Sequence, residues 1–246
     1  MKKGDIIAMK ELFFLRKDLI KIFNEALQTT CGDVREDYAK ISGGVSYNNG
    51  LSRCVWDNRF NRIEREINKL DIDCIRMNRS IWKAPLVLDD DNKVLYIFTS
   101  SENFENVMKK IKEGNKTHYM YILALNSEEG DVEQLELIEE DYAERKKKAE
   151  KLIGDDPDRI NRVVIVHYSY FGNRAIDGTL SLLDNCGNEK FAIKIEDYLI
   201  ENTNDLQETT LSSQGKERNE RSSLVTWNKD KQNRTKDSNN EEKGKG

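Results

Sequence analysis

The sequence is poor in the residues that carry most enzyme chemistry. Its 246 residues include two histidines and four cysteines. His118 and His167 stand alone inside apolar runs, where histidine is more often a hydrogen-bonded core residue than a ligand. No cysteine belongs to a C-x-x-C pair or has a histidine near it. Because acid–base, triad and zinc chemistry depend on histidine or clustered cysteine, we predict no catalytic residue, no metal site and no cofactor.

Nucleotide-binding loops and membrane segments are also missing. Neither G-x-x-x-x-G-K-[ST] nor G-x-G-x-x-G occurs. The longest apolar runs fall short of the ~18 residues that a membrane-spanning helix needs, so we expect no membrane partner. Charged side chains interrupt the N-terminal region too often for a signal peptide. With scattered cysteines that suit a reducing compartment, these features predict a cytoplasmic protein.

The composition is rich in charge and poor in proline. The net charge of −5 argues against a protein that coats nucleic acid by bulk charge, although it leaves room for a local basic patch. Two prolines accompany abundant Lys, Asn, Ile and Glu, which is typical of an AT-rich genome. We therefore interpret the chain as a protein of a bacterium, phage or mobile element.

The hydrophobic period changes along the chain and predicts its organisation. Periods of three and four indicate helices in an N-terminal helical segment, residues 1–80, with Cys31–Asp37 as a break. Ser52 is the expected N-cap of the second long helix, which is expected to end near Leu70. A mixed-sheet α/β core is expected over residues 81–202, in one domain with residues 1–80. Residues 203–246 are polar and are expected to form a disordered tail. Within that tail, Leu224–Trp227 is a candidate docking motif.

The predicted core alternates strands and helices. Strands are expected at Ile81–Leu88, Val94–Phe98, Thr117–Leu125, Val132–Ile138, Arg162–Tyr170, Gly178–Leu183 and Glu189–Lys194. Helices are expected at Ser101–Glu113, Glu139–Ile153 and Ile195–Ile200. This order predicts an α/β or α+β fold: N-terminal helices packed on a mixed β-sheet with flanking helices, followed by a disordered C-terminal tail.

The second N-terminal helix carries the clearest candidate binding surface. Its apolar stripe is formed by Trp56, Phe60, Ile63, Ile67 and Leu70, and we expect all five to be buried against the α/β core. The opposite side carries an Arg row, formed by Arg59, Arg62, Arg65 and Lys69, beside a polar loop with Tyr47 and Asn48. Arginine donates paired hydrogen bonds that suit phosphate, so we predict that these six residues bind nucleic acid or a protein. Two rivals stay open: a face salt-bridged to Glu66, and docking of the acidic segment 128–158 onto the row.

A nuclease of restriction-endonuclease-like topology is the alternative function. Such enzymes place an acidic residue and a Glu-x-Lys on a hairpin that is followed by a helix and a strand, and residues 82–125 are predicted in that order. Thr99, Ser100 and Ser101 stand where Glu-x-Lys is expected, and Asp89–Asp91 lie in the turn. The sequence thus favours a non-enzymatic binding or regulatory accessory protein, with a diverged metal-dependent nuclease as the alternative.

Overall fold

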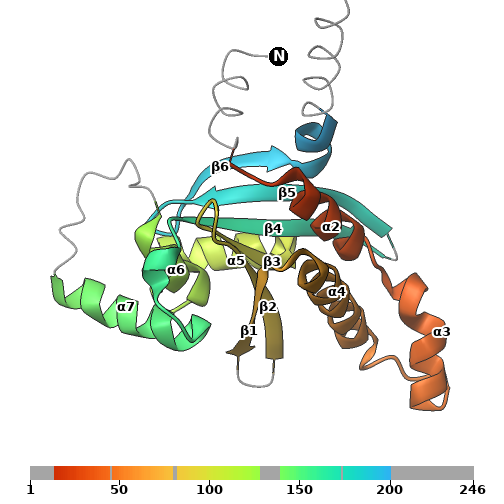
Figure 1. Ribbon diagram of the computed structural model, residues 1–246. Coiled ribbons are helices and arrows are strands. Elements are labelled where there is room, and N and C mark those ends of the chain that lie inside the picture. Colours follow the sequence, from red (N-terminus) through yellow and green to blue (C-terminus); the bar gives the residue numbers. More distant parts are fainter. Residues whose placement is uncertain (1–13, 45, 80–81, 128–138, 173, 201–246) are drawn as a thin grey trace, which may run out of the picture. The chain divides into compact units, whose positions relative to one another are not determined.

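A mixed β-sheet forms the centre of the computed structural model, which describes residues 14–44, 46–79, 82–127, 139–172 and 174–200 (Figure 1). The strands follow one another in sheet order: β1 (Asp73–Arg79), β2 (Trp82–Asp89), β3 (Val94–Ser100), β4 (Arg162–Phe171), β5 (Arg174–Leu183) and β6 (Glu189–Lys194). β3 and β4 are parallel, and the other neighbouring pairs are antiparallel. This mixed sheet with its helices confirms the predicted fold class.

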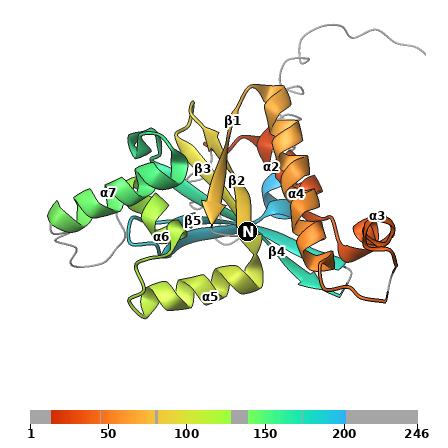
Figure 2. The same ribbon diagram turned by 90° about the horizontal axis from the view of Figure 1, so that it is seen from below.

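Helices cover both faces of the sheet. They are α2 (Lys17–Leu27), α3 (Cys31–Ser42), α4 (Leu51–Ile67), α5 (Ser101–Lys112), α6 (Tyr119–Leu123) and α7 (Glu139–Ile153), with a further helical segment over residues 195–200. Figure 2 shows α5, α6 and α7 on one side of the sheet and α2 and α4 on the other. No helix among the described residues is long and apolar enough to cross a membrane.

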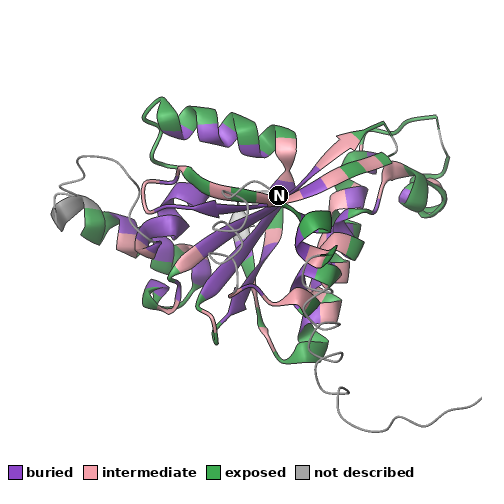
Figure 3. Ribbon diagram, turned by 90° about the horizontal axis from the view of Figure 1, so that it is seen from above, coloured by how far each residue is buried: buried purple, intermediate pink, exposed green. Residues whose placement is uncertain are grey.

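The central strands are apolar on both faces because each face packs against helices. Val94, Tyr96 and Phe98 contact the cluster that includes Leu19, Phe23, Ile63 and Ile67 from α2 and α4. Leu95 and Ile97 contact the opposite cluster, which includes residues of α5, α6 and α7. Figure 3 shows the buried residues along the strands and on the sheet-facing sides of the helices. Burial on both faces explains why β3 and β4 have nearly continuous apolar sequences.

Two local predictions are wrong. The expected strand Thr117–Leu125 is instead α6 followed by a 3-10 turn at Ala124–Asn126, and the His118 ring accepts a hydrogen bond from the Met120 amide at its start. A continuous apolar run fits a buried helix as well as a buried strand. The expected break at Cys31–Asp37 is helical, because Thr30 and Asp33 form a capping box that starts α3.

The boundaries of other elements also differ from the predictions. α4 begins at Leu51 after Gly50, so Ser52 lies inside the helix and is not its N-cap. β1 begins at Asp73, within the segment expected to be helical, and its polar sequence DCIRMNR suits an edge strand paired only with β2. The predicted strand Val132–Ile138, the tail 203–246 and its motif Leu224–Trp227 lie outside the described residues.

Candidate functional site

Arg59, the first member of the predicted Arg row, is buried inside the protein. Its Nε and Nη2 atoms donate hydrogen bonds to the Thr29 carbonyl at 2.9 and 2.6 Å. The guanidinium carbon lies 4.5 Å from the ring centroid of Trp56 and 3.9 Å from that of Tyr170. Removal from water lowers the pKa of Arg59. Arg59 therefore joins α4 to the end of α2 and presents no charge to a ligand.

The other members of the row also bind within the chain. Arg62 donates to the Thr29 hydroxyl at 3.1 Å. Arg65 and Lys69 both pair with Glu66, at 3.1 and 2.5 Å, while their own side chains stay well exposed. The hydrogen bonds and ion pairs from these cations lower the pKa of the Glu66 carboxyl. The row is thus largely compensated by its own helix and by Thr29.

The acidic segment 128–158 does not supply this compensation through its described residues. Asp155 pairs with Arg159, and Asp158 pairs with Lys146 at 2.6 Å, so both carboxylates are used close to α7. Figures 1 and 2 place α7 and α4 on opposite sides of the sheet. Residues 128–138 lie outside the described part of the chain.

Tyr47 and Asn48 lie in the loop that leads into α4. Both side chains are exposed, and the Asn48 carbonyl accepts a hydrogen bond from the Leu51 amide at 3.0 Å. The structure therefore brings this loop to the start of the helix that carries the Arg row. It does not gather the six predicted residues into one pocket, because Arg59 is enclosed while Tyr47 and Lys69 belong to opposite ends of α4.

The apolar stripe of α4 is only partly covered. Ile63 and Ile67 are fully buried, Trp56 and Phe60 are half-buried, and Leu70 is 39% exposed. The expectation that all five are buried is therefore wrong for three of them. Trp56 and Phe60 are open because they face a cavity that the sequence alone does not reveal.

This cavity exists because β2 and β3 separate. Their pairing ends at Leu86 opposite Ile97, although β2 starts at Trp82 and β3 continues to Ser100. Over these ends β2 remains paired with β1, and β3 remains paired with β4. Pro85 lies where the pairing stops and has no amide hydrogen to contribute to a ladder. We call the opening between the two strand ends the fork.

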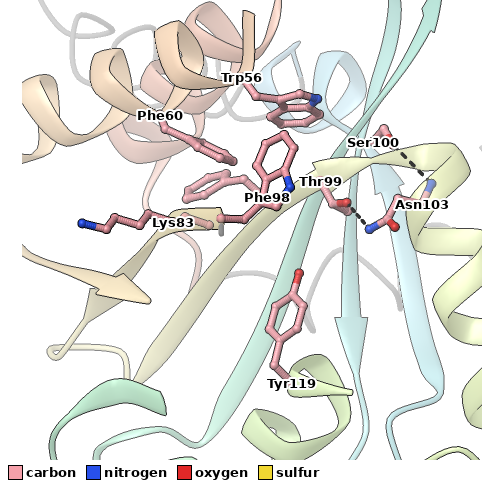
Figure 4. A pocket seen from close by; sticks show the side chains of 10 residues that line it. Trp56, Phe60, Lys83, Phe98, Thr99, Ser100, Asn103 and Tyr119 are labelled. Carbon is pink, nitrogen blue, oxygen red and sulfur yellow. Dashed lines mark hydrogen bonds between the residues drawn. The ribbon is translucent and has the colours of Figure 1, made fainter. Parts of the chain in front are cut away.

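The fork has a volume of about 550 Å³, within the usual range for small-molecule sites. Its lining comes from both helical layers and from the sheet itself: Trp56, Phe60, Trp82, Lys83, Ala84, Phe98, Thr99, Ser100, Asn103 and Tyr119. Figure 4 shows Trp56, Phe60 and Phe98 gathered together, with the Tyr119 hydroxyl pointing in from the other layer. One wall is therefore aromatic and the other polar.

The polar wall is held in place by the start of α5. Ser100 is the N-cap, and its hydroxyl accepts a hydrogen bond from the Asn103 amide at 3.2 Å. The Asn103 side chain donates to the Thr99 hydroxyl at 2.8 Å (Figure 4). These bonds fix three polar side chains at the positive end of the α5 dipole.

The described residues of the fork carry positive charge. Lys83 is exposed and pairs with none of the described residues. The guanidinium of Arg53 lies 5.6 Å from the ring centroid of Trp82, which is 39% exposed. No aspartate or glutamate lines the fork among the residues that the structure describes. The fork can therefore hold a flat apolar group next to an anionic one.

A chain of hydrogen bonds through His167 connects the start of α5 to the sheet. Ser181 donates to Glu189 at 2.6 Å, so its oxygen accepts from His167 Nε2 at 2.9 Å, and His167 Nδ1 accepts from the Ser101 hydroxyl at 2.9 Å. Phe104 stacks on the imidazole with ring centroids 4.5 Å apart. Burial lowers the pKa of His167 to about 4, so the ring is neutral at pH 7. This histidine is a hydrogen-bonded core residue that ties α5 to β4 and β5.

The carboxylates considered for a nuclease lie away from the fork. Asp89 pairs with Val94 at the closed end of the β2–β3 hairpin, whereas Thr99 and Ser100 line the open end. Asp90 is bound by Arg159 at 2.5 Å. Among the described residues, no group of three histidine, cysteine, aspartate or glutamate side chains is placed to hold a metal ion.

Comparison with known proteins identifies a family whose function is unknown. No curated protein and no solved structure matches the chain. One family model matches residues 13–244, which is most of the sequence. The chain therefore belongs to DUF5986, a family of unknown function.

Proposed function

We propose that this protein is a non-enzymatic binding protein that contacts single-stranded nucleic acid, and that the contact is made at the fork. The observation that carries the proposal is the fork itself. Half-buried Trp56 and Phe60 of α4, exposed Trp82 of β2 and buried Phe98 of β3 surround a cavity. Among the described residues that line it, Lys83 is the one with a charge. Single-stranded nucleic acid combines flat bases, which stack on aromatic rings, with phosphates, which attract cations.

The aromatic wall suits an unpaired base. The rings of Trp56 and Phe60 are 5.3 Å apart and tilted, both line the cavity, and both side chains are partly exposed. Stacking of a base on an aromatic side chain contributes about 1–3 kcal/mol. Because the fork opens between the ends of two strands and has a volume of about 550 Å³, a base that has left a duplex suits it better than a base pair does.

The cations near the aromatic wall suit phosphate. Lys83 and Arg53 both lie beside Trp82, and the amino-terminal end of α5 adds its dipole. The Arg row offers less, since Arg59 is buried and Arg65 and Lys69 share Glu66. We therefore move the proposed contact from the Arg row to the fork.

The remaining expectations from the sequence stay predictions. These are the origin in a bacterium, phage or mobile element, the regulatory accessory role and the cytoplasmic location. A diverged nuclease has less support than binding, because Asp89–Asp91 lie at the far end of the hairpin from the fork. Cleavage of oligonucleotides that depends on Mg²⁺ or Mn²⁺ and is lost on removal of Asp89–Asp91 would favour the nuclease.

Fluorescence anisotropy with labelled single-stranded DNA and RNA tests the proposal. Trp82→Ala is expected to weaken binding by about tenfold or more, from the energy of one stacked base. Lys83→Ala should weaken it less and reduce its salt dependence. Trp82 and Lys83 are both exposed, so the variants should remain folded, which circular dichroism checks.

The matched control is Arg65→Ala with Lys69→Ala, which removes the two exposed cations of the Arg row. This variant is expected to bind like the unaltered protein. If it loses affinity while Trp82→Ala does not, the Arg row is the contact and the fork is not. If no single-stranded oligonucleotide binds the unaltered protein, the proposed function is wrong.

A further inference from the structure

A second groove lies next to the fork on the side of the sheet covered by α5, α6 and α7. It has a volume of about 700 Å³ and is lined by Val107, Lys110, Asn115, Thr117, His118, Tyr119, Ile122, Lys148, Lys151 and Leu152. Tyr119 lines this groove and also the fork, so the two hollows share one side chain. We call this second hollow the lysine groove.

The lysine groove is a concentration of positive charge on a chain with a net charge of −5. Lys110 and Lys151 are exposed and pair with none of the described residues. Lys148 pairs with Glu144 at 2.6 Å, one turn earlier on α7, and Glu144 does not line the groove. Among the described residues that line the groove there are three lysines and no carboxylate, so this part of the wall attracts an anion.

The floor of the groove is apolar, and hydrogen bonds hold the turn between α5 and α6 that forms part of its wall. Val107, Ile122 and Leu152 supply the floor from three different helices. The Asn115 side chain accepts hydrogen bonds from the Thr117 amide at 3.1 Å and hydroxyl at 2.7 Å, which holds the turn between α5 and α6. An apolar floor beneath a lysine rim can pack against sugars while the rim contacts phosphates.

We infer that the lysine groove binds the phosphates of the same single strand whose base occupies the fork. The inference rests on the proposed function and adds the course of the strand. Asn103 lines the fork and Lys110 lines the groove, seven positions apart on α5. At 1.5 Å per residue this is about 10 Å. At the spacing of about 3.4 Å per nucleotide that one strand has in a duplex this is about three nucleotides, and a more extended strand covers it with fewer. A strand that fills the fork therefore reaches the groove within a few nucleotides.

The first test is the dependence of affinity on oligonucleotide length. A dinucleotide can occupy the fork alone, whereas a hexanucleotide can also reach the lysine groove. The hexanucleotide is expected to bind more tightly and with a steeper dependence on salt. Equal affinity and equal salt dependence for the two lengths would overturn the inference while leaving the fork as a site.

The second test removes the groove's unpaired charges with Lys110→Ala and Lys151→Ala together. Hexanucleotide affinity should fall about two- to thirtyfold, the range for two exposed ion pairs. The slope of log affinity against log salt should become shallower by about 1.4, from two phosphates at about 0.7 each. Dinucleotide binding should not change. The matched control, Lys112→Ala with Lys147→Ala, removes two exposed cations of the same helices that do not line the groove, and it should leave the slope as it is.

An abasic hexanucleotide separates failure of this inference from failure of the proposed function. It keeps the phosphates but has no base to stack in the fork. Its weak binding should be reduced by the Lys110 and Lys151 substitutions and unaffected by Trp82→Ala. If it responds to neither change while normal oligonucleotides still require Trp82, the groove does not hold the strand. If normal oligonucleotides do not require Trp82, the proposed contact at the fork is wrong.

Discussion

Acidification from pH 7 to pH 5 is expected to destabilise the protein by about 2 kcal/mol through His167. Burial lowers the pKa of this imidazole from 6.5 to about 4. On the unfolded chain the same ring has its ordinary pKa of about 6.5. As the pH falls, the unfolded chain therefore binds a proton before the folded protein does, and the folded state loses stability between about pH 6.5 and pH 4.

The magnitude follows from the two pKa values. At pH 5 the unfolded histidine is almost fully protonated and the folded one is mostly neutral, which costs about 2 kcal/mol. The cost rises toward about 3 kcal/mol at pH 4. Well above pH 6.5 the ring is neutral in both states, so the contribution to stability is fully present there.

The surroundings of His167 support this sign. The ring is covered by Phe104 and bound by Ser101 and Ser181, none of which carries a charge. Lys194 also lowers the pKa of His167, and Asp177 opposes this more weakly. Among the described carboxyl groups, folding lowers the pKa wherever a shift is resolved. Protonation of these carboxylates therefore destabilises the folded protein at a lower pH than protonation of His167 does.

Urea unfolding at pH 7, 6 and 5 measures the effect. His167→Gln should be less stable at pH 7 and should lose the pH dependence between pH 7 and pH 5. His118→Asn, which alters the chain's other histidine and keeps a capping side chain at the start of α6, should retain that dependence. An unaltered protein that is equally stable at pH 7 and pH 5, or a His167→Gln variant with the original slope, would refute the reasoning.

Two further predictions concern stability. Arg59→Ala should lower the free energy of unfolding by about 3 kcal/mol, because it removes two charge-assisted hydrogen bonds and two ring contacts. The control Arg65→Ala should change this free energy by less than about 0.5 kcal/mol in the same urea titration. Gly178→Ala should cost about 1–3 kcal/mol, because an added methyl group would overlap the Tyr168 ring. Thermal unfolding measures this against Gly32→Ala, whose methyl group meets only a hydroxyl at 3.5 Å; equal melting temperatures for the two variants would contradict the overlap.

The sequence was enough to predict those elements whose residue pattern fits only one type of secondary structure. A continuous apolar run rich in β-branched residues identified β4, and apolar residues at spacings of three and four, followed by Gly114 as a stop signal, identified α5. The hairpin of β5 and β6 followed from its turn residues. In each case a strand or helix of that pattern buries its apolar side chains with few alternatives, so local periodicity was enough.

Where two local structures bury the same side chains, the pattern could not decide. The run from Tyr119 to Leu125 is apolar throughout, and it became a helix because α6 packs between the sheet and α7. β1 has too few apolar residues to give a period, and it is a strand because β2 supplies a partner along its whole length. Partners distant in the sequence set both outcomes.

The candidate sites show the same division. The sequence by itself determined which residues are charged and that α4 has an apolar stripe and an Arg row. Only the tertiary structure decided that Arg59 is enclosed by Trp56 and Tyr170, and that β2 and β3 part to leave a fork. It also brought Lys110 of α5 and Lys151 of α7 to one groove. The physical reason is that charge is a property of a residue, whereas exposure and proximity depend on segments that meet only when the chain folds.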